Sequence, residues 1–223
     1  MNAEYLAQME RLLWLYQQPY DARFPVVCFD ERPCFLIGEA VAAEAMQSGK
    51  VRREHYAFEK LGSCALLAAI EPLSGKRFAH IFEQRRKREY ALFLREVAEA
   101  FPNAEKIRLV QDNLNTHCAS AFYETFAADE AFALAQKFEF YYTPKSASWL
   151  NMIEIEFSAI VKQCLNRRIA SRAELEREVL AIVKEREEKA IKIDWQFSLE
   201  SARTKLNRHY EQVLAENLKP EQT

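Results

Sequence analysis

The chain has 223 residues, of which 49% are hydrophobic and 29% are charged. This length and composition predict one mid-sized globular domain, with room for a helical appendage, and exclude disorder over most of the chain. The net charge of -2 means that any polyanion must bind to a local basic patch. The four glycines lie too far apart to form a phosphate-binding loop, which excludes a P-loop and a dinucleotide fingerprint.

The cysteines and the N-terminus indicate a cytoplasmic protein. The five cysteines are odd in number and form no CxxC pair, so we expect reduced, mostly buried thiols and no zinc site. The first residues carry charges where a signal peptide would be apolar. No apolar run approaches the roughly 18 residues that a membrane span requires. We therefore expect a soluble, cytoplasmic protein.

The first part of the chain predicts a helix and then antiparallel strands. Apolar residues recur at helical spacing over residues 4–17, and a linker follows Pro19. Residues 25–31 (PVVCFDE) form an apolar run that predicts a buried strand. Residues 34–40 (CFLIGEA) are expected to return antiparallel to it, and residues 63–76 (SCALLAAIEPLSGK) predict a third strand closed by a turn.

The second part alternates helices and strands. Two further strands are predicted, and each follows a helix; the helices cover residues 88–104 and 118–126, and the strands cover residues 106–113 and 138–144. Two more helices are predicted over residues 149–165, with Ser148 as a cap, and over residues 171–189. The latter is highly charged and is expected to serve packing or oligomerisation. Together these elements predict an α/β domain with a mixed five-stranded sheet.

Three acids mark the candidate site. Asp30 is expected to close the first strand and Asp112 the fourth, while Glu154 follows the fifth strand in SASWLNMIEIEF. Carboxylates at strand ends lie at the crevice edge of an α/β sheet, where ligands bind. An oxygen-only set suits Mg²⁺ or Mn²⁺, and two such ions can activate water and stabilise a leaving oxygen of a phosphodiester. Acids at strand ends are also often solvated loop residues, so spacing alone leaves both interpretations open.

Longer motifs around these acids resemble a known family. The strings VVCFDERP, AIEPLSGK, KIRLVQDNLNTH, YYTPKSASWLNMIEIEF and QCLNRRI occur in the order found in DDE transposases of bacterial insertion sequences, in the insertion sequence six-thirty group, which is related to the mariner elements. The resemblance covers about Leu12 to Tyr210. It implies an RNase H-like fold and an enzyme that cuts transposon ends and joins them to target DNA, typically at a TA dinucleotide.

The resemblance also implies an organisation and a site. We expect an N-terminal helix and linker over residues 1–24, the RNase H-like catalytic domain over residues 25–166 and a C-terminal helical extension over residues 167–223. Asp30 in FDE, Asp112 in QDN and Glu154 in LNMIE correspond to the catalytic metal ligands, for two Mg²⁺ ions that Mn²⁺ can replace. Family members often have proline at the position of Met152. The expected partners are double-stranded DNA and a second copy of the chain.

The third acid has a rival. Glu154 lies 42 residues after Asp112, a longer interval than in the mariner relatives, with the excess in FAADEAFALAQKFE. Glu156 is two residues further on, about 200° around a helix, so only one of the two can face the site. The Asn-x-x-Glu frame of the family ends on Glu154, which we favour.

Further candidates carry two interpretations each. Glu31 could orient a metal-bound water or be a solvated neighbour of Asp30. In DNLNTH, the asparagines and His117 could hold a phosphate or the loop near the metals, or could only form turn hydrogen bonds and cap the next helix. Trp149 could contact DNA or pack in the core. The basic residues could bind DNA phosphates or form a solvated surface. The candidates for these second-shell and DNA-binding roles are Glu31, Asn113, Asn115, His117, Lys145, Trp149, Arg85, Arg86, Arg167 and Arg168.

Recognition of transposon ends is expected to lie elsewhere. About two dozen residues precede the first strand, enough for one helix, whereas a helix-turn-helix region needs at least two. We therefore expect a catalytic domain that is a second reading frame, a truncated copy or a fragment, with little end-specific binding of its own. Two alternatives stay open: an RNase H-like nuclease that hydrolyses without joining, and an inactive remnant that binds DNA or oligomerises as a regulator.

Overall fold

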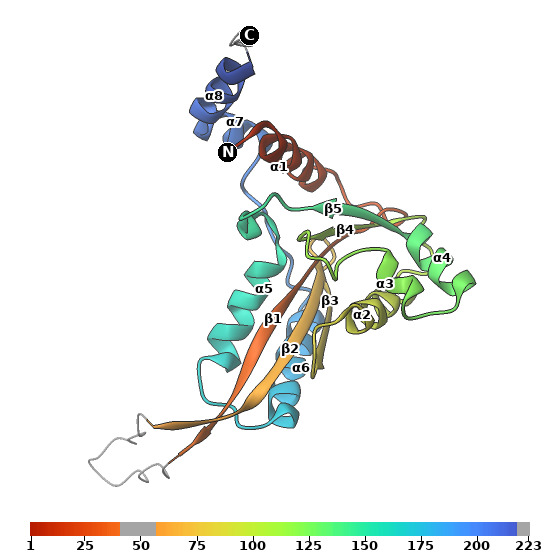
Figure 1. Ribbon diagram of the computed structural model, residues 1–223, viewed down its shortest axis with the longest axis vertical. Coiled ribbons are helices and arrows are strands. Elements are labelled where there is room, and N and C mark those ends of the chain that lie inside the picture. Colours follow the sequence, from red (N-terminus) through yellow and green to blue (C-terminus); the bar gives the residue numbers. More distant parts are fainter. Residues whose placement is uncertain (41–56, 218–223) are drawn as a thin grey trace, which may run out of the picture.

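A computed structural model describes residues 1–40 and 57–217. Five strands form one mixed sheet in the order β3-β2-β1-β4-β5, as the sequence predicts (Figure 1). These strands are β1 (Val26–Glu39), β2 (Phe58–Glu71), β3 (Lys76–Phe82), β4 (Ile107–Gln111) and β5 (Phe138–Tyr142). β2 is antiparallel to both β1 and β3, whereas β4 is parallel to both β1 and β5.

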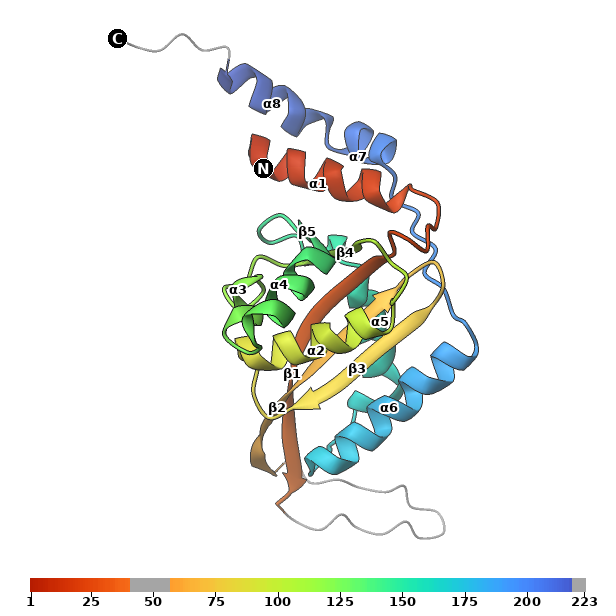
Figure 2. The ribbon, with the colours of Figure 1, turned by 90° about the vertical axis from the view of Figure 1, so that its right-hand side faces the viewer.

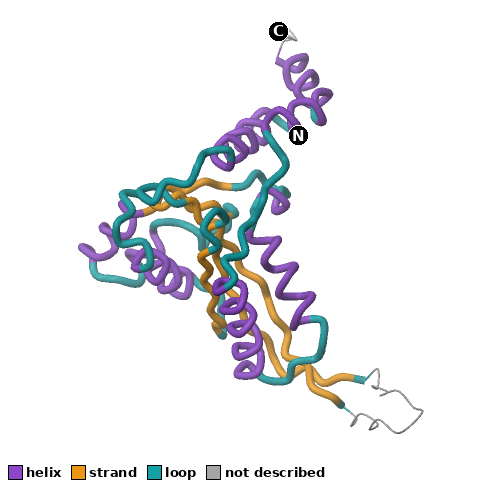
Figure 3. The backbone as a smooth tube through the Cα atoms, turned by 180° about the vertical axis from the view of Figure 1, so that it is seen from behind, coloured by secondary structure: helices purple, strands orange, loops and turns teal. Residues whose placement is uncertain are grey.

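Helices cover both faces of the sheet (Figures 2 and 3). One face packs against α2 (Lys87–Glu99), α3 (Ser120–Tyr123) and α4 (Ala128–Lys137). The other packs against α1 (Ala3–Tyr16), α5 (Ile153–Ile160) and α6 (Arg172–Glu188). Alternate residues of β1 enter different cores, with Val27 and Phe29 on the α2 side and Cys28 on the α5 side. The apolar run in β1 is therefore buried on both faces.

The predicted first and second strands are a single strand. β1 continues from Val26 through Asp30 to Glu39, so residues 34–40 do not return antiparallel and Asp30 lies within the strand instead of closing it. The partner that returns is β2, with Asp30 opposite Ala68. Pro33 does not end β1 because β4 pairs with β1 only as far as Cys28, and proline is tolerated where a strand has no neighbour on one side.

Three other elements differ from the prediction. The turn after β2 leads into β3, where Gly75 adopts a positive φ of 81° and Glu71 accepts the amide of Leu73. The predicted helix over residues 118–126 shortens to α3, and α4 forms separately. The helix expected from Trp149 begins only at Ile153, because Ser148 lies in a short 3₁₀ turn (Ser148–Leu150) and does not cap it. Its last turn (Val161–Leu165) is π-helical.

The remaining helices match the expected pattern more closely. Ser171 caps α6, where its Oγ accepts the amide of Glu174 at 3.2 Å. α6 packs along the sheet through Leu175, Val179 and Val183, which confirms its packing role. Two further helices follow α6, namely α7 (Leu199–Lys205) and α8 (Asn207–Asn217). No helix among the described residues is long and apolar enough to cross a bilayer.

The chain's two ends meet beside the sheet (Figure 2). Glu10 of α1 accepts two hydrogen bonds from Arg203 of α7, at 2.8 and 2.9 Å, and a third from Tyr210 of α8 at 2.7 Å. Below them, the Tyr16 hydroxyl donates to the Leu150 carbonyl at 2.8 Å. α1 is therefore part of the same core as α5 and α6.

All five cysteines are free thiols, as predicted. Four of them are buried and Cys118 is half-buried. Burial raises the pKa of Cys28 to about 12 and that of Cys34 to about 11.

Truncation of the α1 core contact should destabilise the whole domain. Leu13 is fully buried, so Leu13→Ala should lower the free energy of unfolding by about 2–5 kcal/mol in urea denaturation. Trp14→Ala, at a neighbouring side chain that is 49% exposed, should cost less than about 1 kcal/mol. Equal losses for the two variants would contradict the packing of α1 described above.

Candidate active site

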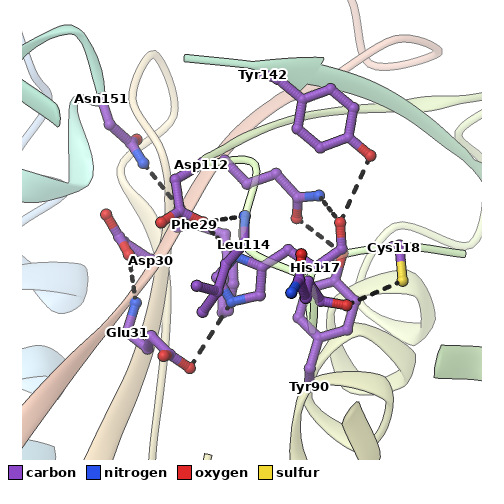
Figure 4. A network of polar contacts seen from close by, with 12 residues as sticks. Phe29, Asp30, Glu31, Tyr90, Asp112, Leu114, His117, Cys118, Tyr142 and Asn151 are labelled. Carbon is purple, nitrogen blue, oxygen red and sulfur yellow. Dashed lines mark hydrogen bonds and ion pairs between the residues drawn. The ribbon is translucent and has the colours of Figure 1, made fainter. Parts of the chain in front are cut away.

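Asp30 and Asp112 come together through the register of two parallel strands. The last pair between β1 and β4 joins Cys28 to Val110, and each acid lies two residues beyond its member of that pair. Side chains two residues apart on a strand share one face, so both acids point to the side of the sheet that α5 covers. Both line one open cavity of about 860 Å³ (Figure 4). Asp112 directly follows β4, as predicted.

The Asp30 carboxyl lies in an unfavourable electrostatic environment. Burial raises its pKa to about 7, and the negative charges of Asp112 and Glu154 contribute to the increase. The Glu31 amide donates to Asp30 Oδ1 at 2.7 Å and opposes part of this shift. Asp112 and Glu154 therefore both repel the charged form of Asp30, and a bound cation would offset this repulsion.

Asp112 is held by His117. The Nδ1 atom of His117 lies 2.5 Å from Asp112 Oδ1, and this contact lowers the pKa of Asp112. Burial disfavours the charged imidazole, but the hydrogen bond to Asp112 and the charges of Asp112 and Glu31 outweigh it and raise the pKa of His117 to about 9. His117 therefore supports an acid of the site, as the second-shell expectation proposed, and its Nδ1 is engaged by Asp112.

Glu31 is not a solvated neighbour of Asp30. Its side chain is only 6% exposed and lies between two cationic groups. Arg85 Nη1 is 3.1 Å from Glu31 Oε1, and His117 Nε2 is 3.7 Å from Glu31 Oε2. Both partners of Glu31 are remote in the chain, so the local sequence could not decide between its two interpretations.

Two buried residues that the sequence analysis did not single out hold the loop after β4. The Tyr90 hydroxyl donates to Gln111 Oε1 at 2.7 Å, and Gln111 Nε2 donates to the His117 carbonyl at 2.9 Å (Figure 4). Tyr90 also stacks on the His117 ring, with centroids 5.0 Å apart. The only signal in the sequence is that Gln111 is a polar residue at the end of an apolar run.

Glu154 and Glu156 occupy opposite environments on α5. Glu156 is buried and bonded to two arginines, Arg77 and Arg186, so its oxygens are engaged away from the cavity. Glu154 lies in the first turn of α5 and lines a separate hollow beside Trp149. Its charge contributes to the raised pKa of Asp30. Glu156 is the less suited of the two to bind a metal ion, because both of its carboxylate oxygens already accept bonds from arginines.

Asn151 connects the start of α5 to β1. Its Nδ2 donates to the Phe29 carbonyl at 2.8 Å, and its side chain is fully buried. Phe29 immediately precedes Asp30. This bond therefore holds the segment just before α5, the helix that carries Glu154, against the part of β1 that carries Asp30 (Figure 4). The Asn-x-x-Glu frame contained this residue, but its bond to β1 spans 122 residues and could not be read from the spacing.

The carboxylates of Asp30, Asp112 and Glu154 are of the type that binds a hard divalent cation, although they do not converge on a single point. In residues 1–40 and 57–217, no three His, Cys, Asp or Glu side chains converge to metal-binding distance. The tight convergence expected of the three acids is therefore not seen. The chemistry of the set nevertheless fits Mg²⁺ or Mn²⁺, because the donors are carboxylate oxygens and the repulsion at Asp30 favours a bound cation.

The expected DNA-binding residues separate into two groups. Lys145 and Asn113 line the cavity of Asp30 and Asp112, next to Ser146, which has a positive φ of 62°. Trp149 is 45% exposed and contacts Phe197 at the edge of the neighbouring hollow, so it is not a core residue.

The arginine candidates Arg85, Arg167 and Arg168 form side-chain bonds within the fold. Arg85 binds Glu31, and the backbone amide of Arg86 donates to Glu89 at the start of α2. Arg167 forms ion pairs with two glutamates of α6, and Arg168 donates to the Ala57 carbonyl. Asn115 is exposed, and its carbonyl accepts from Cys118.

The fold is an α/β domain whose mixed sheet carries two acids, Asp30 and Asp112, on one cavity beside two parallel strands. Residues 25–176 match the family described as DDE superfamily endonuclease, which covers most of the chain. The chain belongs to this family, which confirms the resemblance noted in the sequence.

A solved structure shows the same fold. The structure described as the Mos1 mariner paired end complex with Mn aligns with a TM-score of 0.50 and 14% identity, covering 86% of this chain and 62% of that chain. A pre-cleavage Mos1 transpososome aligns with a TM-score of 0.44 and 14% identity, covering 88% of this chain and 65% of that chain. The chain thus spans less than two thirds of these Mos1 chains. No curated protein matches the sequence.

Removal of the Asp30 charge should stabilise the metal-free protein. A carboxyl whose pKa is raised on folding contributes stability below its unfolded value near 3.8 and loses it as the pH rises through about 7. In EDTA at pH 8, Asp30→Asn should therefore raise the free energy of unfolding by about 1–3 kcal/mol, and the gain should shrink as the pH falls toward 4. Denaturant titration at several pH values measures it.

The matched control is Asp129→Asn, at an exposed acid of α4. It should leave stability nearly unchanged across this pH range. Added Mn²⁺ should stabilise the wild type more than Asp30→Asn, and a wild type that is indifferent to Mn²⁺ would contradict a metal-binding role for Asp30.

Proposed function

We propose that this chain is the catalytic domain of a mariner-type DDE transposase. It cleaves DNA at transposon ends in a metal-dependent reaction and transfers the freed strand into target DNA. The observation that carries the proposal is the grouping of Asp30 and Asp112 on one cavity, within electrostatic reach of Glu154, in a chain of the DDE endonuclease family. We expect this activity in the bacterial cytoplasm, where the chromosome lies.

Asp30, Asp112 and Glu154 would hold the divalent ions, two Mg²⁺ in our proposal, with Mn²⁺ as a substitute. Such ions activate a water or a 3′ hydroxyl and stabilise the leaving oxygen of the phosphodiester. The chain's own residues supply the positioning. His117 and Gln111 fix the loop that carries Asp112, and Asn151 fixes the start of α5 against β1.

Double-stranded DNA is the proposed substrate. Lys145 and Asn113 lie on the cavity of the two aspartates, where a cation and an amide can bind phosphate oxygens. Trp149 offers an exposed ring at the side of Glu154. The matched Mos1 structures are described as a mariner paired end complex and a pre-cleavage transpososome, and by analogy we propose a TA target and a homodimeric active assembly for this chain.

Nicking should require Asp112. In the presence of Mn²⁺, the wild type should convert supercoiled plasmid to open circles, and Asp112→Asn should reduce the rate at least 100-fold because it removes a charged ligand. Asp129→Asn, at an acid outside the cavity, should retain the wild-type rate. EDTA should abolish nicking by both the wild type and Asp129→Asn.

The products decide between the three functions considered. Joined products from transposon-end substrates would support strand transfer, whereas hydrolysed products alone would identify a nuclease. A wild type that nicks no faster than Asp112→Asn would identify an inactive remnant.

Lys145 should contribute to DNA binding without sequence preference. Lys145→Ala should weaken binding to a short duplex about 2–10-fold and reduce the salt dependence by about one counterion, as expected for one phosphate contact. Lys184→Ala, at an exposed lysine of α6 paired with Glu188, is the control and should leave affinity unchanged. Fluorescence anisotropy over a salt series measures both quantities, and equal effects of the two variants would contradict the contact.

A further inference from the structure

Beneath α5, Glu156 connects three elements that are distant in the sequence. Arg77 of β3 donates to it through Nε and Nη2, each at 2.9 Å. Arg186, in the last turn of α6, donates through Nε at 3.0 Å and Nη2 at 2.9 Å. Both carboxylate oxygens therefore accept two bonds, and the Glu156 and Arg77 side chains are 4% and 2% exposed. We call these three residues the Glu156 clasp.

The clasp is fixed from behind as well. Arg77 Nη1 donates to the Gly75 carbonyl at 2.6 Å, and its Nη2 donates to the Ile191 carbonyl at 2.5 Å. The turn at Gly75 lies so close to this segment that an added Cβ would meet the Ile191 carbonyl oxygen at 3.0 Å. The guanidinium of Arg77 therefore has little freedom to follow α5 if the helix moves.

Glu156 and Glu154 share one short helix and face opposite ways. Two residues correspond to about 200° of rotation, so a carboxylate anchored on the buried side determines where the other one points. A carboxylate lies roughly 6 Å from the helix axis, and a roll of about 10° would displace it by about 1 Å. A displacement of that size can cost about 100-fold in rate.

We propose that Glu156, Arg77 and Arg186 are positioning residues that set the rotation of α5 and thereby the orientation of Glu154 relative to Asp30 and Asp112. This inference rests on the function proposed above. Asn151 anchors the start of α5 to β1, and the clasp anchors the opposite side of the helix to β3 and α6. A helix held at two points on different sides cannot roll freely, whereas either anchor alone leaves a rotation open.

The decisive variant is Arg186→Leu. It removes one arginine but leaves Glu156 paired with Arg77, so no buried carboxylate loses its last partner. The matched control is Arg172→Leu, on the same helix. Arg172 binds the Ile81 carbonyl at 2.8 Å and Glu83 at 3.0 Å, so it holds α6 to β3 without contacting α5.

Three readouts test the clasp. For Arg186→Leu we expect nicking about 10–100-fold slower, Mn²⁺ binding about 5–10-fold weaker by electron paramagnetic resonance, and faster amide hydrogen exchange over Ile153–Ile160. Arg172→Leu should remain within about 2-fold of the wild type in all three. Arg186→Lys keeps the charge but not the paired bonds, so its values should fall between those of the wild type and Arg186→Leu.

The outcomes separate this inference from the proposed function. Equal Mn²⁺ affinity and equal nicking in Arg186→Leu and Arg172→Leu would overturn the positioning role. If Arg186→Leu does not fold, Arg186→Lys against Arg172→Lys makes the same comparison with the same criteria. A wild type that neither binds Mn²⁺ nor nicks DNA would refute the function, and exchange over α5 would then show whether Arg186 holds the helix at all.

Discussion

β1 and β4 pair in parallel over only three residues each, from Val26 to Cys28 and from Arg108 to Val110. The backbone continues past the last pair in two directions. β1 runs on along β2, and β4 leads into the loop of Asp112 and His117. The crevice outside such strand ends is where α/β sheets bind ligands. Here the Phe29 carbonyl, one residue beyond the last pair, accepts Asn151 Nδ2, so a side chain takes over where the ladder stops. The placement of all three acids depends on this point of divergence.

Where β1 and β4 separate, Asp30 and Asp112 lie on the same cavity, and neighbouring residues must compensate for their charge. Asp112, His117, Glu31 and Arg85 form a series of alternating sign from the cavity to the start of α2. Burial raises the pKa of Asp30, whereas the hydrogen bond from His117 lowers that of Asp112. Asp30 therefore lies beside the cavity as a carboxyl whose charged form is disfavoured, and a bound cation would favour that form.

The sequence predicted the sheet and the acids better than the elements that hold them. Apolar runs and their acids are local signals, so Asp112 could be placed at the end of a strand and Glu154 in a helix from spacing and motif. The single long strand β1 could not, because Pro33 is a strand breaker unless one knows that no neighbour pairs on that side. β3 was missed because its short, partly polar sequence becomes a strand only by pairing with β2.

The choice between Glu154 and Glu156 shows the same limit. Their local sequences are alike, and the difference lies in Arg77 and Arg186, which are 79 and 30 residues away from Glu156. The two interpretations of Glu31 stayed open for the same reason, since its cationic partners are set by the tertiary fold. Contacts of long sequence separation decide which acids are structural and which remain available.

The unequal burial of the five thiols allows the loop between β4 and α3 to be labelled selectively. A thiol reacts through its thiolate, and burial suppresses that form at Cys28 and Cys34, while Cys64 and Cys164 are also buried. Cys118 is the half-buried exception, one residue after His117. A maleimide fluorophore on the unaltered protein should therefore label the very segment that carries Asp112, and report on its environment without an engineered cysteine.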